Sequence, residues 1–227
     1  MSKIKYFIVL ICGVVMMSCE DASELLNQHL KDGPIVYAGK IDHMNVQSGY
    51  YRVRVNLYPA EDVNRSHCKL SWKISNELKD SVIVNYNPDN YDEDLDCYYA
   101  IISLPSIEGN LLIEAQNVDV FGNLSLMNSE GAFIYGETYV STLQNSSVHL
   151  SNNQEIVFEN RVGAVGNLVS YEQLNGQFTD EIFIEADVYP LLNPKPGGII
   201  RTKTGYLMND SDIDVLFPST YMETTIP

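Results

Sequence analysis

The alternation of apolar and polar residues separates a short apolar leader from a long body. Residues 6–17 form an apolar run that is preceded by Lys3 and Lys5. A run of this length is too short to cross a bilayer as a permanent helix, but it fits the central segment of a secretory signal peptide. We therefore predict that residues 1–18 are a signal peptide.

From residue 35 onward the pattern has a period of two, which is typical of half-buried β-strands. Tyrosine, valine and leucine alternate with Arg52, Arg54 and Asn56 over residues 51–57. Short strands are predicted at residues 36–42, 51–57, 68–74, 81–86, 98–104, 111–118 and 132–135. Short strands separated by turn-rich loops, with no strong helix among them, predict an antiparallel β-sandwich over residues 34–143.

A second group of strands follows a serine- and asparagine-rich hinge at residues 144–153. The strands of this group are predicted at residues 155–158, 168–174, 182–188, 198–207 and 213–217. Asn175-Gly176 is a two-residue turn signal. The sequence predicts a second, smaller β-sandwich over residues 144–227, so the expected fold class is all-β, with two tandem antiparallel sandwiches. The two halves share no obvious sequence repeat.

The end of the apolar run indicates how the exported chain is held. Ser18 is a small residue and Cys19 follows it directly. This arrangement resembles a bacterial lipobox, in which the cysteine is acylated and everything before it is removed. An ordinary signal peptide with an accidental cysteine is the alternative. We predict a lipoprotein that is attached to the membrane through a lipid on Cys19.

Residues 19–33 are predicted to be a lipid-anchored acidic tether. Residues 23–31 carry a serine N-cap and leucines on one face, so a short helix can form there and end by Gly33. Glu20 and Asp21 follow the acylated cysteine and resemble the surface-export signal of Bacteroidetes lipoproteins. We therefore expect an outer-membrane lipoprotein exposed on the cell surface, and the periplasmic face is the alternative.

Several segments resemble one known family. They are residues 33–40 (GPIVYAGK), residues 71–72 (SW), residues 114–125 (EAQNVDVFGNLS) and residues 135–139 (YGETY). These segments are similar to the Bacteroidetes lipoprotein family called domain of unknown function 4998, and residues 114–125 look like a strand and turn of a fibronectin type III sandwich. The resemblance runs from about Asp32 to the C-terminus. It implies sandwich domains on a lipid anchor and transfers no catalytic residue.

Composition and charge exclude some partners. The chain has 14 basic and 30 acidic residues, which gives a formal net charge of −16. Binding to a phosphate backbone needs clustered lysine and arginine, and the sequence has no such cluster. Nucleic acid is therefore not expected as a partner. An anionic membrane would repel the body, so attachment must come from the lipid.

The sequence carries no recognisable catalytic or metal-binding motif. Residues 92–96 and 210–214 have the D-x-D-x-D opening of a calcium loop, but both lack the glycine and glutamate that such a loop needs further on. The histidines are isolated, and there is no nucleophile elbow, phosphate loop or dinucleotide fingerprint. We predict no enzyme, no cofactor and no bound metal. A looser calcium site at Asp89, Asp92 and Asp94 is left open against a solvated acidic loop.

Two cysteines remain outside the predicted leader and lipid site. A bridge between Cys68 and Cys97 would close a loop of about 28 residues and contribute roughly 3 kcal/mol, and the exported compartment permits it. Both residues also lie in strand-like runs, where a free buried cysteine packs as a small hydrophobe. The sequence leaves both states open.

Binding is the function class that remains. The chain has 15 tyrosines, which supply rigid amphipathic contact surface. We assign ligand binding to Tyr86, Asp89 and Tyr91, because aromatic rings stack on sugars while polar groups meet their hydroxyls. In the competing interpretation, Tyr86 and Tyr91 pack the base of their loop. The expected function is a glycan-capture accessory of a polysaccharide-uptake system; the alternative is a structural spacer or a protein-binding, adhesive module in a surface assembly.

Overall fold

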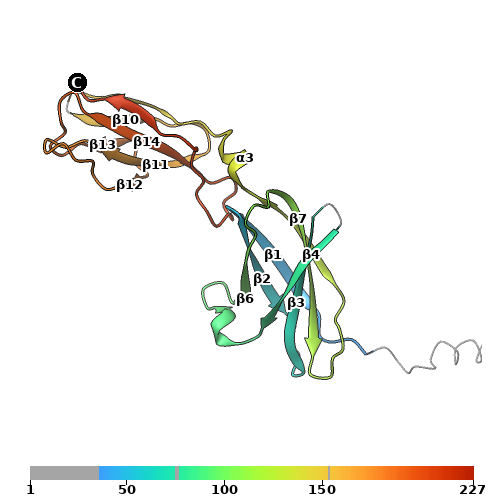
Figure 1. Ribbon diagram of the computed structural model, residues 1–227. Coiled ribbons are helices and arrows are strands. Elements are labelled where there is room, and N and C mark those ends of the chain that lie inside the picture. Colours follow the sequence, from blue (N-terminus) through green and yellow to red (C-terminus); the bar gives the residue numbers. More distant parts are fainter. Residues whose placement is uncertain (1–35, 75–76, 153) are drawn as a thin grey trace, which may run out of the picture. The chain divides into compact units, whose positions relative to one another are not determined.

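The computed structural model describes residues 36–227, apart from residues 75, 76 and 153 (Figure 1). The predicted signal peptide, the lipidation site Cys19 and the tether helix lie outside the described residues, so the predictions about them stay predictions. Residues 38–227 form one compact unit, and the account below concerns that unit. Within the described residues, no helix has the length and apolar character needed to span a membrane.

The first half of this unit is a sandwich of two antiparallel sheets. One sheet has the order β1-β2-β6-β5, with bounds Ile41–Gly49, Arg52–Pro59, Cys97–Ser103 and Tyr91–Asp92. The other has the order β4-β3-β7-β8, with bounds Glu77–Asn85, Arg65–Ile74, Gly109–Asp119 and Asn128–Ile134. This strand order is that of immunoglobulin-like and fibronectin type III-like sandwiches.

Alternation along each strand explains which side chains enter the first core. On β2, Val53, Val55 and Leu57 are fully buried, while Arg52 and Arg54 lie on the outer face. Side chains from β3 and β7 meet them from the opposite sheet. Trp72 is also in this core, as its alternation with Leu70 on β3 predicts. The single tryptophan is therefore a packing residue.

The second half repeats the same connectivity with shorter strands. One sheet has the order β13-β10-β9, with bounds Val188–Pro190, Glu155–Glu159 and Ser147–Leu150. The other has the order β12-β11-β14-β15, with bounds Ile182–Ile184, Ala164–Tyr171, Ile199–Tyr206 and Met222–Thr225. A separate core contains Ile156, Phe158, Val169, Tyr171 and Ile200. The two sandwiches thus share a strand order without sharing a sequence repeat.

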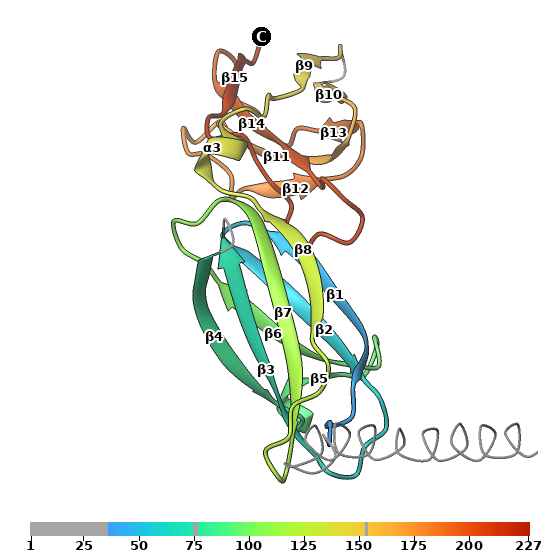
Figure 2. The same ribbon diagram turned by 90° about the vertical axis from the view of Figure 1, so that its right-hand side faces the viewer.

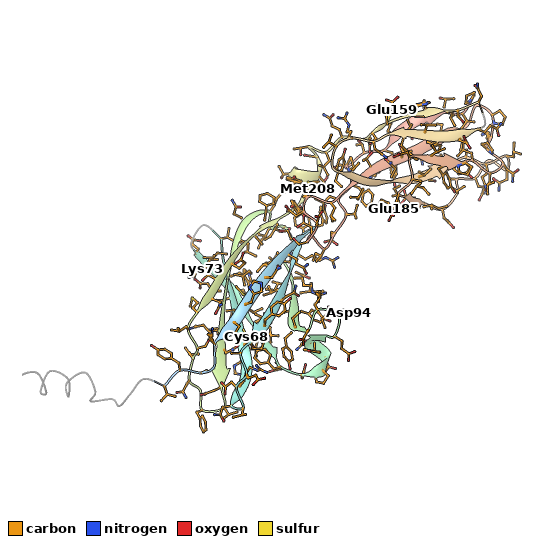
Figure 3. The ribbon with its side chains drawn as sticks, turned by 180° about the vertical axis from the view of Figure 1, so that it is seen from behind. Cys68, Lys73, Asp94, Glu159, Glu185 and Met208 are labelled. Atoms are coloured by element: carbon orange, nitrogen blue, oxygen red, sulfur yellow. The ribbon has the colours of Figure 1, made fainter. Side chains whose placement is uncertain are left out.

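A third, aromatic cluster lies around the helix α3 (Glu137–Val140), between β8 and β9. Tyr135 and Tyr139 have ring centroids 4.9 Å apart, and Phe133 packs against both rings. The Tyr139 hydroxyl lies 3.0 Å from the sulfur of Met208, which comes from the β14–β15 loop (Figure 3). This cluster also buries Val140 and Leu216.

The predicted fold class is confirmed: the chain is all-β, with two tandem antiparallel sandwiches. The domain boundaries at residues 34–143 and 144–227 stay predictions. Three predicted strands differ from the structure. Residues 213–217 lie in the β14–β15 loop and make only an isolated bridge, from Leu216 to Tyr206. Residues 182–188, predicted as one strand, contain β12 and the start of β13, which belong to different sheets. The first strand, predicted at residues 36–42, begins only at Ile41. Strand β9 lies inside the stretch that was predicted to be a hinge.

Candidate functional site

The structure gathers the two predicted ligand-binding tyrosines around a third tyrosine. Tyr86 follows β4 directly, and its ring packs edge-on against Tyr98 with centroids 4.7 Å apart. Tyr91, on β5, packs against the same ring with centroids 5.0 Å apart. Asp89 lies on a short 3₁₀ helix, Pro88–Asn90, and is exposed. The predicted residues therefore share one loop, but Asp89 faces solvent while the two rings pack on Tyr98.

The hydroxyl groups of both tyrosines donate to side chains of the protein, Tyr86 in a part-buried bond and Tyr91 in an exposed one. Tyr86 donates to the Asn117 side chain, and burial raises the pKa of Tyr86 above its ordinary range. Tyr91 donates to the Asp96 carboxylate, and this bond, followed by burial, raises the pKa of Tyr91 to about 12. A ligand would have to add to these bonds or break them. The geometry is that of the packed-loop interpretation more than of an open platform.

Both body cysteines are buried free thiols in this structure. Cys68 lies on β3, within the first sandwich (Figure 3), and Cys97 begins β6 in the opposite sheet. Burial raises the pKa of the Cys68 thiol to about 12, so the thiol is protonated and unreactive at neutral pH. The structure therefore shows the free-thiol state of the two that the sequence allows.

In each aspartate-rich motif, residues 92–96 and 210–214, one aspartate forms an ion pair with an arginine of β2. Asp92 pairs with Arg54, and Asp214 pairs with Arg52. The hydrogen bond from Arg54 is the main cause of the lowered pKa of Asp92. In the part of the chain that the structure describes, no three histidine, cysteine or acidic side chains are grouped so that they could hold a metal ion.

A hollow of about 600 Å³ lies where β2, α3 and the β14–β15 loop meet. Its apolar lining comes from Val140, Val215, Leu216, Phe217 and Pro218. Its polar lining comes from Tyr50, Arg52, Glu137, Lys203, Asp214 and Ser219. A lining that combines apolar side chains with several polar groups is the usual composition of a small-molecule site.

Asp214 is fixed on one side of this hollow. Its Oδ2 atom accepts the Arg52 Nε–H at 2.9 Å and the Tyr50 backbone N–H at 2.8 Å, and its other oxygen accepts from Arg52 Nη2. Burial opposes ionisation of Asp214, but the hydrogen bonds from Arg52 and Tyr50 outweigh it and lower the pKa of this carboxyl. Asp214 is therefore an ionised, oriented acceptor.

Glu137 and Lys203 contribute the other two charges of the hollow. Glu137 accepts the Tyr50 hydroxyl at 3.0 Å and the Ser219 hydroxyl at 2.9 Å. The Lys203 ammonium donates to the Ser219 carbonyl at 3.3 Å and lies 4.4 Å from the centroid of the Tyr221 ring. Two anionic and two cationic side chains thus line one concave surface, which can accept and donate hydrogen bonds at once.

Sequence reasoning did not identify this hollow. Arg52 was recognised only as an outward residue of a strand, and Asp214 only as part of an incomplete calcium motif. The two residues are 162 positions apart, and nothing local links them. The only signal in the sequence is the charge of residues 210–214, and charge alone does not name a partner.

Comparison with known families places the chain with one of them. The profile of a family described as a domain of unknown function matches residues 19–216. No curated protein sequence matches the chain.

Solved structures show distant likenesses. The three fibronectin type III domains FN1–FN3 of chicken CNTN1 are 11% identical, with a TM-score of 0.39, covering 84% of this chain and 66% of that one. A two-domain fibronectin type III segment of chicken tenascin is 10% identical, with a TM-score of 0.34, covering 82% and 99%. A family 76 glycoside hydrolase from a bovine Bacteroides thetaiotaomicron strain is 11% identical, with a TM-score of 0.37, covering 45% of this chain and 22% of the hydrolase.

Proposed function

The chain belongs to the family called domain of unknown function 4998, and from this premise we propose that it is a non-enzymatic, lipid-anchored surface protein that captures a glycan. The proposed site is the hollow beside Arg52 and Asp214 rather than the Tyr86–Tyr91 loop. In this proposal the chain is held at the outer membrane through Cys19 and exposes its body on the cell surface.

The composition and size of the hollow carry this proposal. Its volume of about 600 Å³ lies within the range of about 300–1,000 Å³ that is usual for small-molecule pockets. A sugar ring has apolar C–H faces, which suit Phe217 and Pro218, and hydroxyl groups, which suit the charged lining. Lys203 carries three donors, one of which is used by the Ser219 carbonyl, so the others can meet hydroxyl oxygens.

The state of Asp214 favours binding over hydrolysis. A glycosidase needs two carboxyl groups across the scissile bond, one of them a general acid with a raised pKa. Asp214 and Glu137 both line the hollow, but Asp214 has a lowered pKa and both of its oxygens accept hydrogen bonds from Arg52. It is unsuited to deliver a proton or to attack a sugar carbon. The hollow is accordingly proposed to hold its ligand without cleaving it.

Affinity electrophoresis and calorimetry on residues 20–227 test this function against a panel of polysaccharides and their oligosaccharides. Lys203→Ala and Phe217→Ala should each weaken binding about tenfold, the effect of losing one charged hydrogen bond or one stacking surface. Lys195→Ala is the matched control, because Lys195 lies on the same sandwich and pairs with Glu172 outside the hollow. Tyr86→Ala and Tyr91→Ala test the loop that the sequence favoured.

Two results would overturn the proposal. The first is the absence of retention on every polysaccharide tested. The second is binding that Lys203→Ala and Phe217→Ala leave unchanged while Tyr86→Ala or Tyr91→Ala abolishes it, because the site would then be the loop.

A structural spacer is the second candidate function. It is favoured by the hydrogen bonds that the β14–β15 loop makes with β1. Ile213 N–H donates to the Ser48 carbonyl at 2.9 Å, and the Gln47 amide donates to the Ser211 carbonyl at 2.9 Å. A spacer would keep these bonds and bind no sugar, so the same calorimetry separates the two functions.

A further inference from the structure

Two loops meet at one end of the first sandwich. They are the β2–β3 loop, residues 60–64, and the β7–β8 loop, residues 120–127. Val120 N–H donates to the Asn64 carbonyl at 2.8 Å, which joins the two loops. Figures 1 and 2 both show them at the end of the sandwich where β3 begins and β7 ends. We call this surface the apolar end.

The apolar end exposes large apolar side chains. Val63 is 98% exposed and Phe121 is 75% exposed. Val120, Leu124, Leu126 and Met127 are also exposed. Residues 120–127 contain no charged residue, although the chain as a whole has 30 acidic and 14 basic ones. Contiguous exposed apolar surface of this kind marks an interaction site in soluble proteins.

The loop that carries Phe121 is held in one shape. The Asp119 carboxylate accepts the backbone N–H groups of Phe121 at 2.9 Å and of Asn123 at 2.8 Å, and it also accepts the Asn123 amide at 2.8 Å. Gly122 provides the positive φ of 85° that the turn requires. Because the turn is fixed from within, binding does not have to order the backbone of this loop.

The course of the chain identifies what meets this surface. Ala38 N–H donates to the Leu124 carbonyl at 3.3 Å, so the polypeptide enters the first sandwich beside the β7–β8 loop. Cys19 lies about 19 residues earlier, a length that spans at most about 65 Å. A chain anchored at Cys19 therefore keeps the apolar end within reach of the bilayer.

We propose that the apolar end docks on the bilayer surface, with Phe121 and Val63 inserted among the lipid headgroups. The inference rests on the lipid anchor of the proposed function and goes beyond it, because it assigns a second membrane contact to the folded body. The charges of this surface favour headgroups without net charge, because residues 120–127 are uncharged and anionic headgroups would repel the exposed Glu61 near Val63. Interfacial amphipathic helices bury their apolar face about 5–10 Å deep, and we expect a similar depth for these loop tips.

The test replaces the acyl group by a histidine tag before Glu20 and holds residues 20–227 on phosphatidylcholine vesicles that contain a nickel-chelating lipid. An environment-sensitive fluorophore is attached at Phe121→Cys or at Val63→Cys. Val162→Cys is the matched control, since Val162 is 102% exposed on the β10–β11 loop. Cys68 and Cys97 are buried and do not compete for the label. Equal thermal unfolding midpoints confirm that the three variants fold.

Docking predicts that nitroxide-labelled lipids quench the probes at residues 121 and 63 at least about twofold more than the probe at residue 162, as expected for insertion at headgroup depth. Equal quenching at all three positions would overturn the proposal. Protection of residue 121 on intact cells without quenching on vesicles would also overturn it and would indicate a partner protein. Because the tag replaces the acyl group, a failure of Cys19 acylation or of glycan binding is detected separately.

Discussion

Arg52 and Asp214, which are 162 positions apart in the sequence, form a bidentate ion pair beside the hollow. The guanidinium of Arg52 lies on the outer face of β2, and the Asp214 carboxylate reaches it from the β14–β15 loop. The Asp214 side chain is only 18% exposed, whereas that of Arg52 is 43% exposed. Removing Arg52 therefore leaves Asp214, the less exposed partner, without its counterion. The loss of folding free energy should follow from this uncompensated carboxylate.

Arg52→Ala should lower the free energy of unfolding by about 1–2 kcal/mol, a value at the low end for a broken pair because solvent reaches Arg52. Urea unfolding at pH 7 measures the loss. Lys40→Ala is the control, since Lys40 pairs with Asp42 on the surface. An effect no larger than that of Lys40→Ala would contradict the structural role given to the pair.

The same pair makes stability depend on pH. The pKa of Asp214 is lowered from an ordinary value near 3.8. A carboxyl whose folded pKa is lowered contributes stability above its unfolded pKa, and the contribution is lost as the pH falls through the folded pKa. The wild type should therefore lose more stability than Asp214→Asn as the pH falls from about 5 toward the pH at which the protein unfolds. Parallel urea titrations across this range check the difference, and identical slopes would contradict it.

Gly49→Ala should disrupt the contact between the β1–β2 turn and the β14–β15 loop. A Cβ atom at this position would lie 2.5 Å from Asp214 Oδ2 and 2.7 Å from Ile213 Cγ1, so the loop would have to move. We expect a loss of about 1–3 kcal/mol, as for other overpacked sites. Gly131→Ala is the matched control, because its Cβ would meet only the Leu111 carbonyl at 3.9 Å. Thermal and urea unfolding of the two variants should differ clearly, and equal stabilities would contradict the contact.

Much of the fold could be predicted because it depends on local alternation. The pattern of residues 51–57 predicts β2, and its outward arginines follow from the same period. Residues 213–217 are mostly apolar, yet they form a loop. Ile213 bonds to Ser48 of β1, and Asp214 bonds to Tyr50 and Arg52, so only Leu216 pairs with β14. Tertiary contacts there override the local preference.

The hollow could not be predicted for the same physical reason. Its lining comes from residues 50–52, 137–140, 203 and 214–219, and no single segment carries a recognisable pattern. The Tyr86–Tyr91 loop was visible in the sequence because its residues are adjacent. The strand that carries Tyr98 is predicted, but its pairing with β5, which places Tyr91 on Tyr98, is a tertiary contact that no local pattern reveals.

Tyr86→Phe should destabilise the first sandwich, whereas Tyr91→Phe should not. The Tyr86 hydroxyl bonds to Asn117, whose side chain is 1% exposed and also donates to the Gly39 carbonyl at 2.8 Å. Removing this donor leaves a buried amide oxygen without its partner, which costs about 1–3 kcal/mol. The acceptor of Tyr91, Asp96, is exposed and can bind water instead. Urea unfolding compares the two variants, and equal stabilities would contradict the burial assigned to Tyr86.

Cys68 and Cys97 should not react with a thiol reagent in the native protein and should react once it is unfolded. Burial raises the pKa of Cys68 to about 12, so the thiolate that reacts with a disulfide reagent is nearly absent at pH 8. Cys97 is also buried, with 1% of its surface exposed. A thiol assay on residues 20–227, which lack Cys19, should detect almost no reaction in buffer and two thiols in urea without reductant.

Detection of no thiol in urea, followed by two after reduction, would show that the protein as made contains the Cys68–Cys97 bridge. Rapid reaction in native buffer would contradict the burial of both thiols, and Cys68→Ala and Cys97→Ala would identify which of them is accessible.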